Sequence, residues 1–424
     1  MNAVLGALDH GVLDAAELRH RLGVSAPTMM RAVRQAEARV IRIGRARATR
    51  YGLRELWPGL DVSRFPVFRV SDSGAAQPGG EVFTLAVRQT VWMPAGAVSN
   101  GLPIQLADAR PSGFLGRHFA AAHAELRLPA RLADWSDHHT LIALSRRGED
   151  LPGNLLLGDE SFTRWQALDV VAKNRDDYPE LAEATIAGHP PGSSAGGERP
   201  KFCVFADGRH RLVKFAARST DAVATRWCDL LVLEALALDL VASRGIPAAR
   251  TRVVERPSHW FLESERFDRA GARGRLAVLS LAAVHNDPSH SWAQAAVELR
   301  NAGRLSNEDA RRLRWLDAFG AFIGNSDRHQ FNILVFPDGV NLRLAPAFDQ
   351  VSMLYAPSAD GHVPARTFTL PRASSATLDV WDDARAAARD FWGRASDDGR
   401  VSDELRSACS ANAHALLTGA DPWA

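Results

Sequence analysis

A tight hairpin followed at once by one long helix is the sequence feature that most restricts the fold. Two β-like segments, Lys201–Ala206 and Arg211–Phe215, are joined by Asp207-Gly208, a dipeptide typical of a two-residue hairpin turn. A largely apolar stretch of helical character follows from about residue 222 to 243, and Gly245-Ile246-Pro247 ends it. Strand, turn, strand and long helix in this order predict an α+β body.

Lysine is almost absent from the chain, and its few positions are informative. Of 51 positively charged residues only three are lysines, Lys173, Lys201 and Lys214, and two of these lie in the predicted hairpin. Lysine carries a compact point charge that suits phosphate, where arginine carries a planar fork. A glycine-rich segment, residues 188–200, directly precedes the hairpin, and backbone N–H groups of such a loop can cover phosphates.

The long helix and the strand after it could complete a nucleotide site. A helix carboxylate can orient a strand lysine, and Glu234 is the candidate for Lys214, with Asp229 on the same helix as its rival. The segment Trp260–Arg269 starts as a strand and ends charged. If it joins two lobes, its backbone at Glu265–Phe267 would face an adenine edge.

A second block supplies acidic and amide groups at a spacing that suits phosphoryl transfer. A helix that begins at Ser306 ends at Gly324, and Asp327 and Asn332 follow it with four residues between them. Asp349 comes after a predicted pair of strands. Phosphoryl transfer needs a carboxylate that orients the attacking hydroxyl and hard oxygen ligands that hold Mg²⁺. Asp327 suits the first role, and Asn332 and Asp349 suit the second.

The first 55 residues form a basic module. They contain ten arginines and five acidic residues, although the whole chain has a net charge of only +2. Helices predicted over 2–9, 14–22 and 25–39 precede a basic hairpin over 40–53, which is the order of a winged helix-turn-helix. A solvated arginine face is the alternative interpretation. The residues predicted to bind DNA are Arg31, Arg34, Arg45, Arg47 and Arg50.

Composition limits the class of protein. At 424 residues the chain suggests two or three domains, and 46% hydrophobic with 24% charged residues is the balance of a soluble globular protein. The three cysteines are scattered and outside CxxC pairs, which favours the reducing cytoplasm. No apolar run reaches the roughly 20 residues of a membrane helix, and no signal peptide is evident at the start.

Several of these segments together resemble one family. IGNSDRHQFNILVF and LAPAFD, with RPKFCV, RLVKF and ESERFDR upstream, look like the HipA family of serine/threonine kinases, the toxins of type II toxin–antitoxin systems. The basic N-terminal module resembles the YjjJ-like (HipH) branch. The resemblance implies an α+β, bilobal HipA/protein-kinase-like body with an N-terminal winged helix-turn-helix. It divides the chain into a DNA-binding domain (1–57), a HipA N-terminal subdomain (62–160), a small kinase lobe (161–270) and a helical large lobe (271–424).

The resemblance also implies roles for residues, with ATP and Mg²⁺ as cofactors. Asp327 is the expected catalytic base, and Lys214 is the catalytic residue expected to contact the nucleotide phosphates. Asn332 and Asp349 are the expected ligands of Mg²⁺ and phosphate. Ser194, with Ser193 as its rival, is the expected site of autophosphorylation. The residues expected to contact nucleotide are Gly196, Gly197, Glu198, Arg199, Pro200, Lys201, Lys214, Glu265, Arg266, Phe267, His329, Asn332, Phe348 and Asp349.

The expected partners are a protein substrate, DNA bound by the N-terminal module, and an antitoxin, with no membrane. An aminoacyl-tRNA synthetase is a family precedent for the substrate. Two other hypotheses remain open. The chain could be a DNA-binding transcriptional regulator whose kinase body is inert or only senses nucleotide. It could also be a metal-dependent nuclease that uses Asp327, His329 and Asp349.

Overall fold

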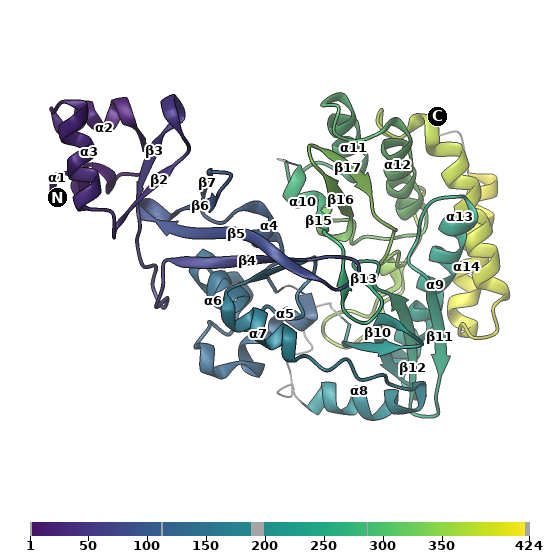
Figure 1. The fold of residues 1–424 in the computed structure, drawn as a ribbon. Helices are drawn as coiled ribbons and strands as arrows, with labels where there is room; N and C mark the ends of the chain where they lie inside the picture. The colour runs from purple at the N-terminus through teal and green to yellow at the C-terminus, as the bar shows by residue number, and fades with distance from the viewer. Residues whose placement is uncertain (1, 112, 188–198, 286, 420–424) are drawn as a thin grey trace. The chain divides into compact units, whose positions relative to one another are not determined.

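The computed structural model describes residues 2–111, 113–187, 199–285 and 287–419. The chain divides into two compact units, Met1–Asp169 and Val170–Ala424 (Figure 1). Both units mix helices and sheets, so the predicted α+β class is confirmed. Within the described residues, no helix is both long enough and apolar enough to cross a membrane. All three cysteines are free thiols.

The first unit opens with three short helices and a small sheet. Asp14 caps the second helix by accepting a hydrogen bond from the Glu17 backbone, as its position predicts. The third helix ends at Gln35, four residues before the predicted end. The elements are α1 (Asn2–Leu8), β1 (Leu13–Asp14), α2 (Ala15–Leu22), α3 (Ala26–Gln35), β2 (Val40–Ile43) and β3 (Arg50–Leu53), with strand order β1-β3-β2.

A five-stranded antiparallel sheet with strand order β7-β6-β5-β4-β8 forms the rest of the first unit. The apolar run 81–92 is two strands, because Val87 and Arg88 adopt a left-handed turn with φ of 50° and 58°. The elements are β4 (Arg64–Val70), β5 (Ala76–Leu85), β6 (Gln89–Met93), β7 (Ala97–Asn100), α4 (Ile104–Asp108), α5 (Gly113–Ala122), α6 (Asp137–Arg147), β8 (Leu155–Leu157) and α7 (Asp159–Ala167).

The predicted hairpin lies in the second unit and is confirmed. Helix α8 (Tyr178–Ala187) precedes a four-stranded antiparallel sheet with strand order β11-β12-β10-β9. Its turn residues Asp207 and Gly208 have φ of 49° and 71°, as a two-residue hairpin turn requires. The long helix α9 (Ala222–Ser243) has the predicted bounds. The strands are β9 (Lys201–Ala206), β10 (Arg209–Ala217), β11 (Thr251–Glu255) and β12 (His259–Glu265).

Helices make up most of the remaining chain. Ser306 caps α12 by accepting from the Asp309 backbone N–H, as predicted. The short strands β13 (Arg269–Ala270) and β14 (Gly274–Arg275) pair with each other, and a three-stranded sheet has the order β15-β16-β17. The other elements are β15 (Leu279–Ser280), α10 (Leu281–Val284), α11 (Trp292–Asn301), α12 (Asn307–Phe322), β16 (Leu334–Asp338), β17 (Asn341–Leu344), α13 (Trp381–Asp397) and α14 (Asp403–Thr418).

The largest hydrophobic core of the second unit lies between α9 and the helices after it. Helix α9 is buried along most of its length, and α11, α12, α13 and α14 contribute buried aromatic and aliphatic residues to the same core. Leu233 of α9 and Leu316 of α12 are both fully buried. This core holds the helical part and one face of the β9–β12 sheet together.

Leu316→Ala is expected to destabilise the second unit by about 2–5 kcal/mol, because it removes buried methyl groups and leaves a cavity. Urea unfolding followed by tryptophan fluorescence measures the change. The matched control is Leu417→Ala, which changes a leucine that is 62% exposed and should alter the unfolding free energy by no more than about 0.5 kcal/mol. Equal losses in the two variants would contradict this assignment of the core.

Candidate functional site

A buried lysine lies at the centre of the candidate site. Lys214 is on β10, and its Nζ lies 2.6 and 2.9 Å from the two carboxylate oxygens of Glu234 on α9. The same Nζ lies 2.5 Å from Oδ1 of Asp349, in the loop after β17. Burial alone lowers the pKa of this ammonium, but the charges of Asp349 and Glu234 outweigh burial and raise it. Lys214 is therefore a permanent cation held by two acids.

The sequence left open which carboxylate of α9 pairs with Lys214, and the geometry decides it. Glu234 is the partner of Lys214, and its side chain is only 1% exposed. Asp229 accepts hydrogen bonds from the backbone N–H and the hydroxyl of Ser402, at 2.7 and 2.6 Å. Asp229 therefore caps α14 and stays out of the lysine cluster.

Asp349 adopts a backbone conformation that is unusual for its residue type. Its φ is 56°, in the left-handed region that costs a non-glycine residue energy and that is enriched at functional sites. Burial raises the pKa of its carboxyl, but Lys214, Lys201 and Arg199 outweigh burial and hold the pKa well below its usual range. Asp349 is thus a carboxylate aimed at three cations, and 31% of its side chain stays exposed.

The segment that carries Asp327 is anchored from several sides. The backbone N–H of Asp327 donates to the side chain of buried Asn325 at 3.0 Å. Arg328 donates to Asp317 of α12 at 3.1 Å and to the Asn325 carbonyl. Arg328 passes so close to Gly320 that a Cβ there would lie 2.7 Å from its Cδ. These contacts fix the loop backbone and leave the Asp327 side chain 55% exposed.

Two other predicted site residues of this loop, Asn332 and His329, lie beside Asp327. Asn332 donates its amide Nδ2–H to the Asp327 carbonyl at 2.9 Å, which leaves its amide oxygen as the atom for another ligand. His329 Nε2 lies 3.6 Å from Asp327 Oδ1, and its ring is half exposed. Asn325, Arg328 and Asp317 are supporting residues that the sequence reading missed. The Asn-Ser-Asp turn was the available signal, because Asn often accepts from the backbone two residues later.

A small pocket brings the predicted cations and acids together. It is lined by Arg199, Lys201, Lys214, Asp327, Asp349, Val351 and Met353. Arg199 donates to Glu234 at 3.5 Å and lies over the ring of Trp227. Pro200 precedes β9, and its carbonyl accepts from the Phe215 backbone at 3.2 Å. Five predicted residues lie outside the described part of the chain: Ser193, Ser194, Gly196, Gly197 and Glu198.

The predicted adenine segment is only partly available. The backbone N–H of Glu265 donates to Arg250 and that of Arg266 to His210, both at 2.9 Å. These two groups are therefore already used within the protein. Phe267 differs, because its ring lies 5.9 Å from the ring of Phe348, next to Asp349. Phe267 thus lies against Phe348, which is also predicted to contact nucleotide.

The basic N-terminal module presents the predicted arginines unevenly. Arg31 and Arg34 are exposed on α3, while Met29 and Val33 of the same helix are buried. Arg45 and Arg47 are exposed between β2 and β3. The remaining one, Arg50, donates to the Gly96 carbonyl at 2.7 Å and is partly buried. Four of the five predicted arginines are thus exposed.

Comparisons with known proteins place the chain. A model of the HipA-like C-terminal domain matches residues 193–414, and one of the middle domain of YjjJ-like toxins matches residues 61–166. Toxin YjjJ of Escherichia coli (strain K12) is 34% identical over 425 residues, covering 96% of this chain and 95% of that protein. The chain belongs to the HipA-like toxin family.

A solved structure supports the same fold. It is a toxin–antitoxin complex from Shewanella oneidensis MR-1, described as HipA, HipB and operator DNA. The match has a TM-score of 0.54 at 13% identity and covers 83% of this chain and 96% of the other. The HipA-like α+β fold is therefore shared, although the sequences have diverged widely.

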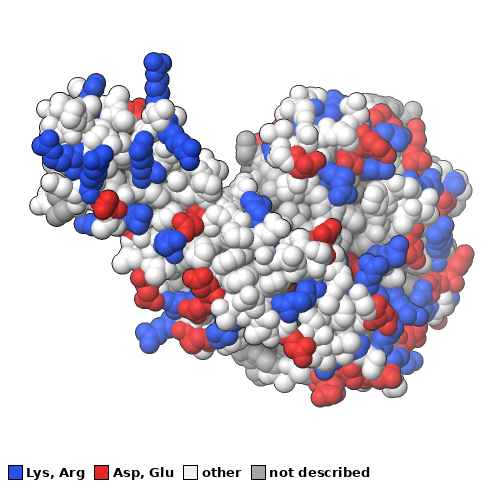
Figure 2. All heavy atoms as spheres, in the orientation of Figure 1, with Lys and Arg blue, Asp and Glu red and all other residues white. Residues whose placement is uncertain are grey.

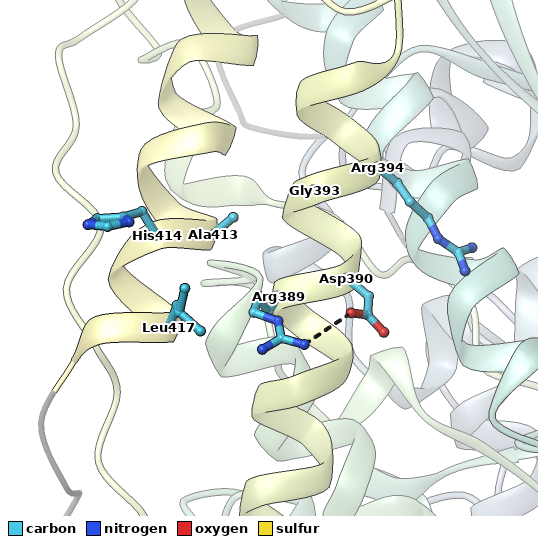
Figure 3. Close-up of a pocket in the computed structure, with 7 residues that line it drawn as sticks. All are labelled: Arg389, Asp390, Gly393, Arg394, Ala413, His414 and Leu417. Carbon is cyan, nitrogen blue, oxygen red and sulfur yellow. Dashed lines mark ion pairs between the residues drawn. The ribbon is translucent and has the colours of Figure 1, made fainter.

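A second hollow of this HipA-like toxin lies between α13 and α14 (Figure 3). Arg389 and Asp390 form an ion pair beside it, and Arg394 points away from the other side chains. Leu417 on α14 adds an exposed apolar side chain. None of the predicted kinase residues lines this hollow, so the Lys214 pocket is the site that the chemistry favours.

The pH dependence of stability tests the Asp349 ion pair. A carboxylate whose pKa is depressed in the folded protein stabilises it above the unfolded pKa of about 4, and this contribution is lost as pH falls towards the folded pKa. Between about pH 5 and about pH 2 the wild type should therefore lose more stability than Asp349→Asn. Urea unfolding at stepped pH measures both, with exposed Asp338→Asn as control. Parallel curves for wild type and Asp349→Asn would contradict the ion pair.

Proposed function

We propose that this chain is an ATP- and Mg²⁺-dependent protein serine/threonine kinase that acts as the toxin of a toxin–antitoxin system. The observation that carries the proposal is the placement of Lys214 between Glu234 and Asp349, in a pocket that Asp327 also lines. A lysine held by a helix glutamate, next to a metal-binding aspartate, is the arrangement that positions nucleotide phosphates in kinases. The family assignment supports the same conclusion.

The cationic side of the pocket fits a phosphate chain. The buried Nη2 of Arg199 has no hydrogen-bond partner among the described residues, and such an atom favours an anionic ligand. Lys201 and Lys214 line the same pocket. Their compact ammonium groups can each approach a phosphate oxygen, while Arg199 can bind two.

The acidic side fits a magnesium ion. Asp349 offers a carboxylate, and Asn332 offers the amide oxygen that its contact with Asp327 leaves over. Oxygen donors of this kind are the ligands that Mg²⁺ prefers. When bound, the ion would neutralise charge on the phosphates. Its arrival would also change the partners of Asp349, which pairs with Lys214 in the present structure.

The residues of this chain divide the remaining work. Asp327, whose side chain is exposed at the pocket, accepts the proton of the attacking hydroxyl and orients it. Phe267 and Phe348 provide aromatic surface for the adenine ring of ATP. The segment 265–267 would serve as the hinge between the two lobes. His329 lies close enough to Asp327 to help orient it. Ser194 or Ser193 is the proposed site of autophosphorylation.

Partners and domain boundaries follow the same proposal. The chain would phosphorylate a protein, for which an aminoacyl-tRNA synthetase is the family precedent, and it would be restrained by an antitoxin. The solved relative is described with HipB and operator DNA. We retain the four-part division at 1–57, 62–160, 161–270 and 271–424.

Asp327→Asn is expected to lower phosphoryl transfer from labelled ATP to protein by about 10²–10⁴-fold, because it removes the base while preserving the side-chain shape. The exposed position of Asp327 predicts an unchanged melting temperature. Asp338→Asn is the matched control, an exposed aspartate in the hairpin between β16 and β17, and should retain full activity.

Two outcomes would overturn the proposal that the chain is a kinase. Full transfer by Asp327→Asn would remove its catalytic role. Cleavage of DNA with Mg²⁺ and without ATP, lost in Asp349→Asn, would instead support the nuclease hypothesis. That hypothesis gives no role to Lys214 and Glu234, which is why the kinase is preferred.

A second proposed activity is DNA binding by the N-terminal module. Three helices followed by the β2–β3 hairpin, with a sheet of order β1-β3-β2, suit a winged helix-turn-helix. Figure 2 shows positive side chains gathered over this module. The exposed arginines there are Arg19, Arg21, Arg31, Arg34, Arg39, Arg42, Arg45 and Arg47. A surface rich in exposed arginines is the electrostatic footprint of a DNA-binding protein. DNA binding without phosphoryl transfer would favour the regulator hypothesis.

Replacing Arg31 and Arg34 together by Glu is expected to weaken DNA binding and to reduce the slope of log affinity against log salt by about 2, because two phosphate contacts are lost. Fluorescence anisotropy at several salt concentrations measures both. The control reverses the same number of charges in the second unit, at exposed Arg311 and Arg389. Equal effects of the two double variants would show that net charge alone is responsible.

A further inference from the structure

A compact cluster of two histidines and one glutamate lies in the second unit, outside the pocket described above. His285 follows α10, His290 lies just before α11, and Glu298 is on α11. His285 Nε2 is 2.9 Å from Glu298 Oε2, and His290 Nδ1 is 3.1 Å from Glu298 Oε1. One donor atom from each residue lies within 4.8 Å of the other two. The glutamate therefore bridges the two imidazoles.

Both ring nitrogens of His285 lie within hydrogen-bond distance of an oxygen atom. Its Nδ1 lies 3.0 Å from the Asp287 carbonyl, which can only accept, and 3.4 Å from the Asp287 backbone N–H, which can only donate, so its contacts allow either ring tautomer. The amide Nε2 of Gln330 uses its two hydrogens on the carbonyls of Asp287 and His290, at 2.7 and 2.9 Å. In the tautomer with the proton on Nδ1, Nε2 of His285 and Oε2 of Glu298 are two acceptors 2.9 Å apart, and a shared cation would join them.

His290 provides an independent sign that this cluster suits a cation. Its Nδ1 is buried and has no hydrogen-bond partner among the described residues, although Glu298 Oε1 is only 3.1 Å away. The two atoms are thus close without the alignment that an N–H donor needs. Two ligands of one tetrahedral ion, each about 2.0–2.2 Å from it, lie about 3.3–3.6 Å apart and point at the ion instead of at each other.

We propose that His285, His290 and Glu298 form a binding site for a divalent transition-metal ion of the Zn²⁺ type. Two imidazoles and one carboxylate are a ligand set that zinc accepts, with water completing four-coordination. The second contact of His285, from Nδ1 to a backbone carbonyl, is the usual support of a metal-binding histidine. His290 and Glu298 are 29% and 53% exposed, so an ion can enter from solvent.

The site would act as a clamp on the loop that carries Asp327. Gln330 of that loop donates to the carbonyls of Asp287 and His290, both in the segment between α10 and α11. Trp292 Nε1, at the start of α11, donates to the His329 carbonyl at 3.0 Å. An ion that joins His285 and His290 to Glu298 would therefore fix the segment on which these loop contacts depend. This role does not rest on phosphoryl transfer.

The test is metal binding to the full chain after chelator treatment and dialysis. Calorimetric titration with Zn²⁺ in excess Mg²⁺ should give one ion per chain, and Co²⁺ should give the visible absorption of a four-coordinate site. His290→Ala and Glu298→Gln should each weaken Zn²⁺ binding at least ~10-fold, because each removes a ligand. Circular dichroism checks that both variants fold. Zn²⁺ should also slow amide exchange in a peptide covering residues 325–332 of the wild type.

The matched control is His123→Ala in the first unit, where His123 and Glu125 form a simple pair at 3.8 Å. It should leave Zn²⁺ binding unchanged. Absence of stoichiometric binding by the wild type would overturn the proposal and leave a hydrogen-bonded cluster. Binding that survives both ligand variants would also overturn it, because the ion would then lie elsewhere. If bound Zn²⁺ left the amide exchange rate of residues 325–332 unchanged, the proposed effect on the loop would be wrong.

Discussion

The ion pairs of one buried lysine decide how the second unit must assemble. A buried ammonium without partners would cost several kcal/mol, so Lys214 requires both of its acids. Glu234 comes from the helix after the hairpin, and Asp349 comes from 135 residues later in the chain. A single side chain therefore connects the β9–β12 sheet, α9 and the loop after β17. The pocket exists because these three segments meet there.

The acids around this lysine are held by different means, and the difference suits their proposed roles. Glu234 is enclosed on a helix and has little freedom. Asp349 depends on a left-handed backbone and on the nearby cations, so a metal ion could compete for it. Asp327 projects from a loop whose backbone is fixed by Asn325 and Arg328. A rigid backbone with an exposed carboxylate is what a base needs in order to meet a protein substrate.

Local signals in the sequence predicted local structure well. The Asp207-Gly208 turn, the bounds of α9 and the Ser306 cap are all set by a few adjacent residues, and the structure confirms them. The left-handed turn at Val87 and Arg88, which separates β5 from β6, has no such local signal, because nothing in a β-branched Val87 indicates it. The His285 cluster was missed for another reason. Its members are spread over 14 positions without a motif, and the fold brings them together from the end of α10, the loop before α11 and α11 itself.

The choice of lysine at position 214 is itself a physical argument for the site. This chain uses arginine for nearly every other positive charge. Here the cation must contact two carboxylates from different elements at 2.5–2.9 Å, inside a buried space. An ammonium can do this because its three hydrogens surround one small atom, whereas a guanidinium spreads its donors across a plane. Lys201 pairs with Lys214 across β9 and β10 and lines the same pocket, so two of the three lysines lie where compact charge is needed.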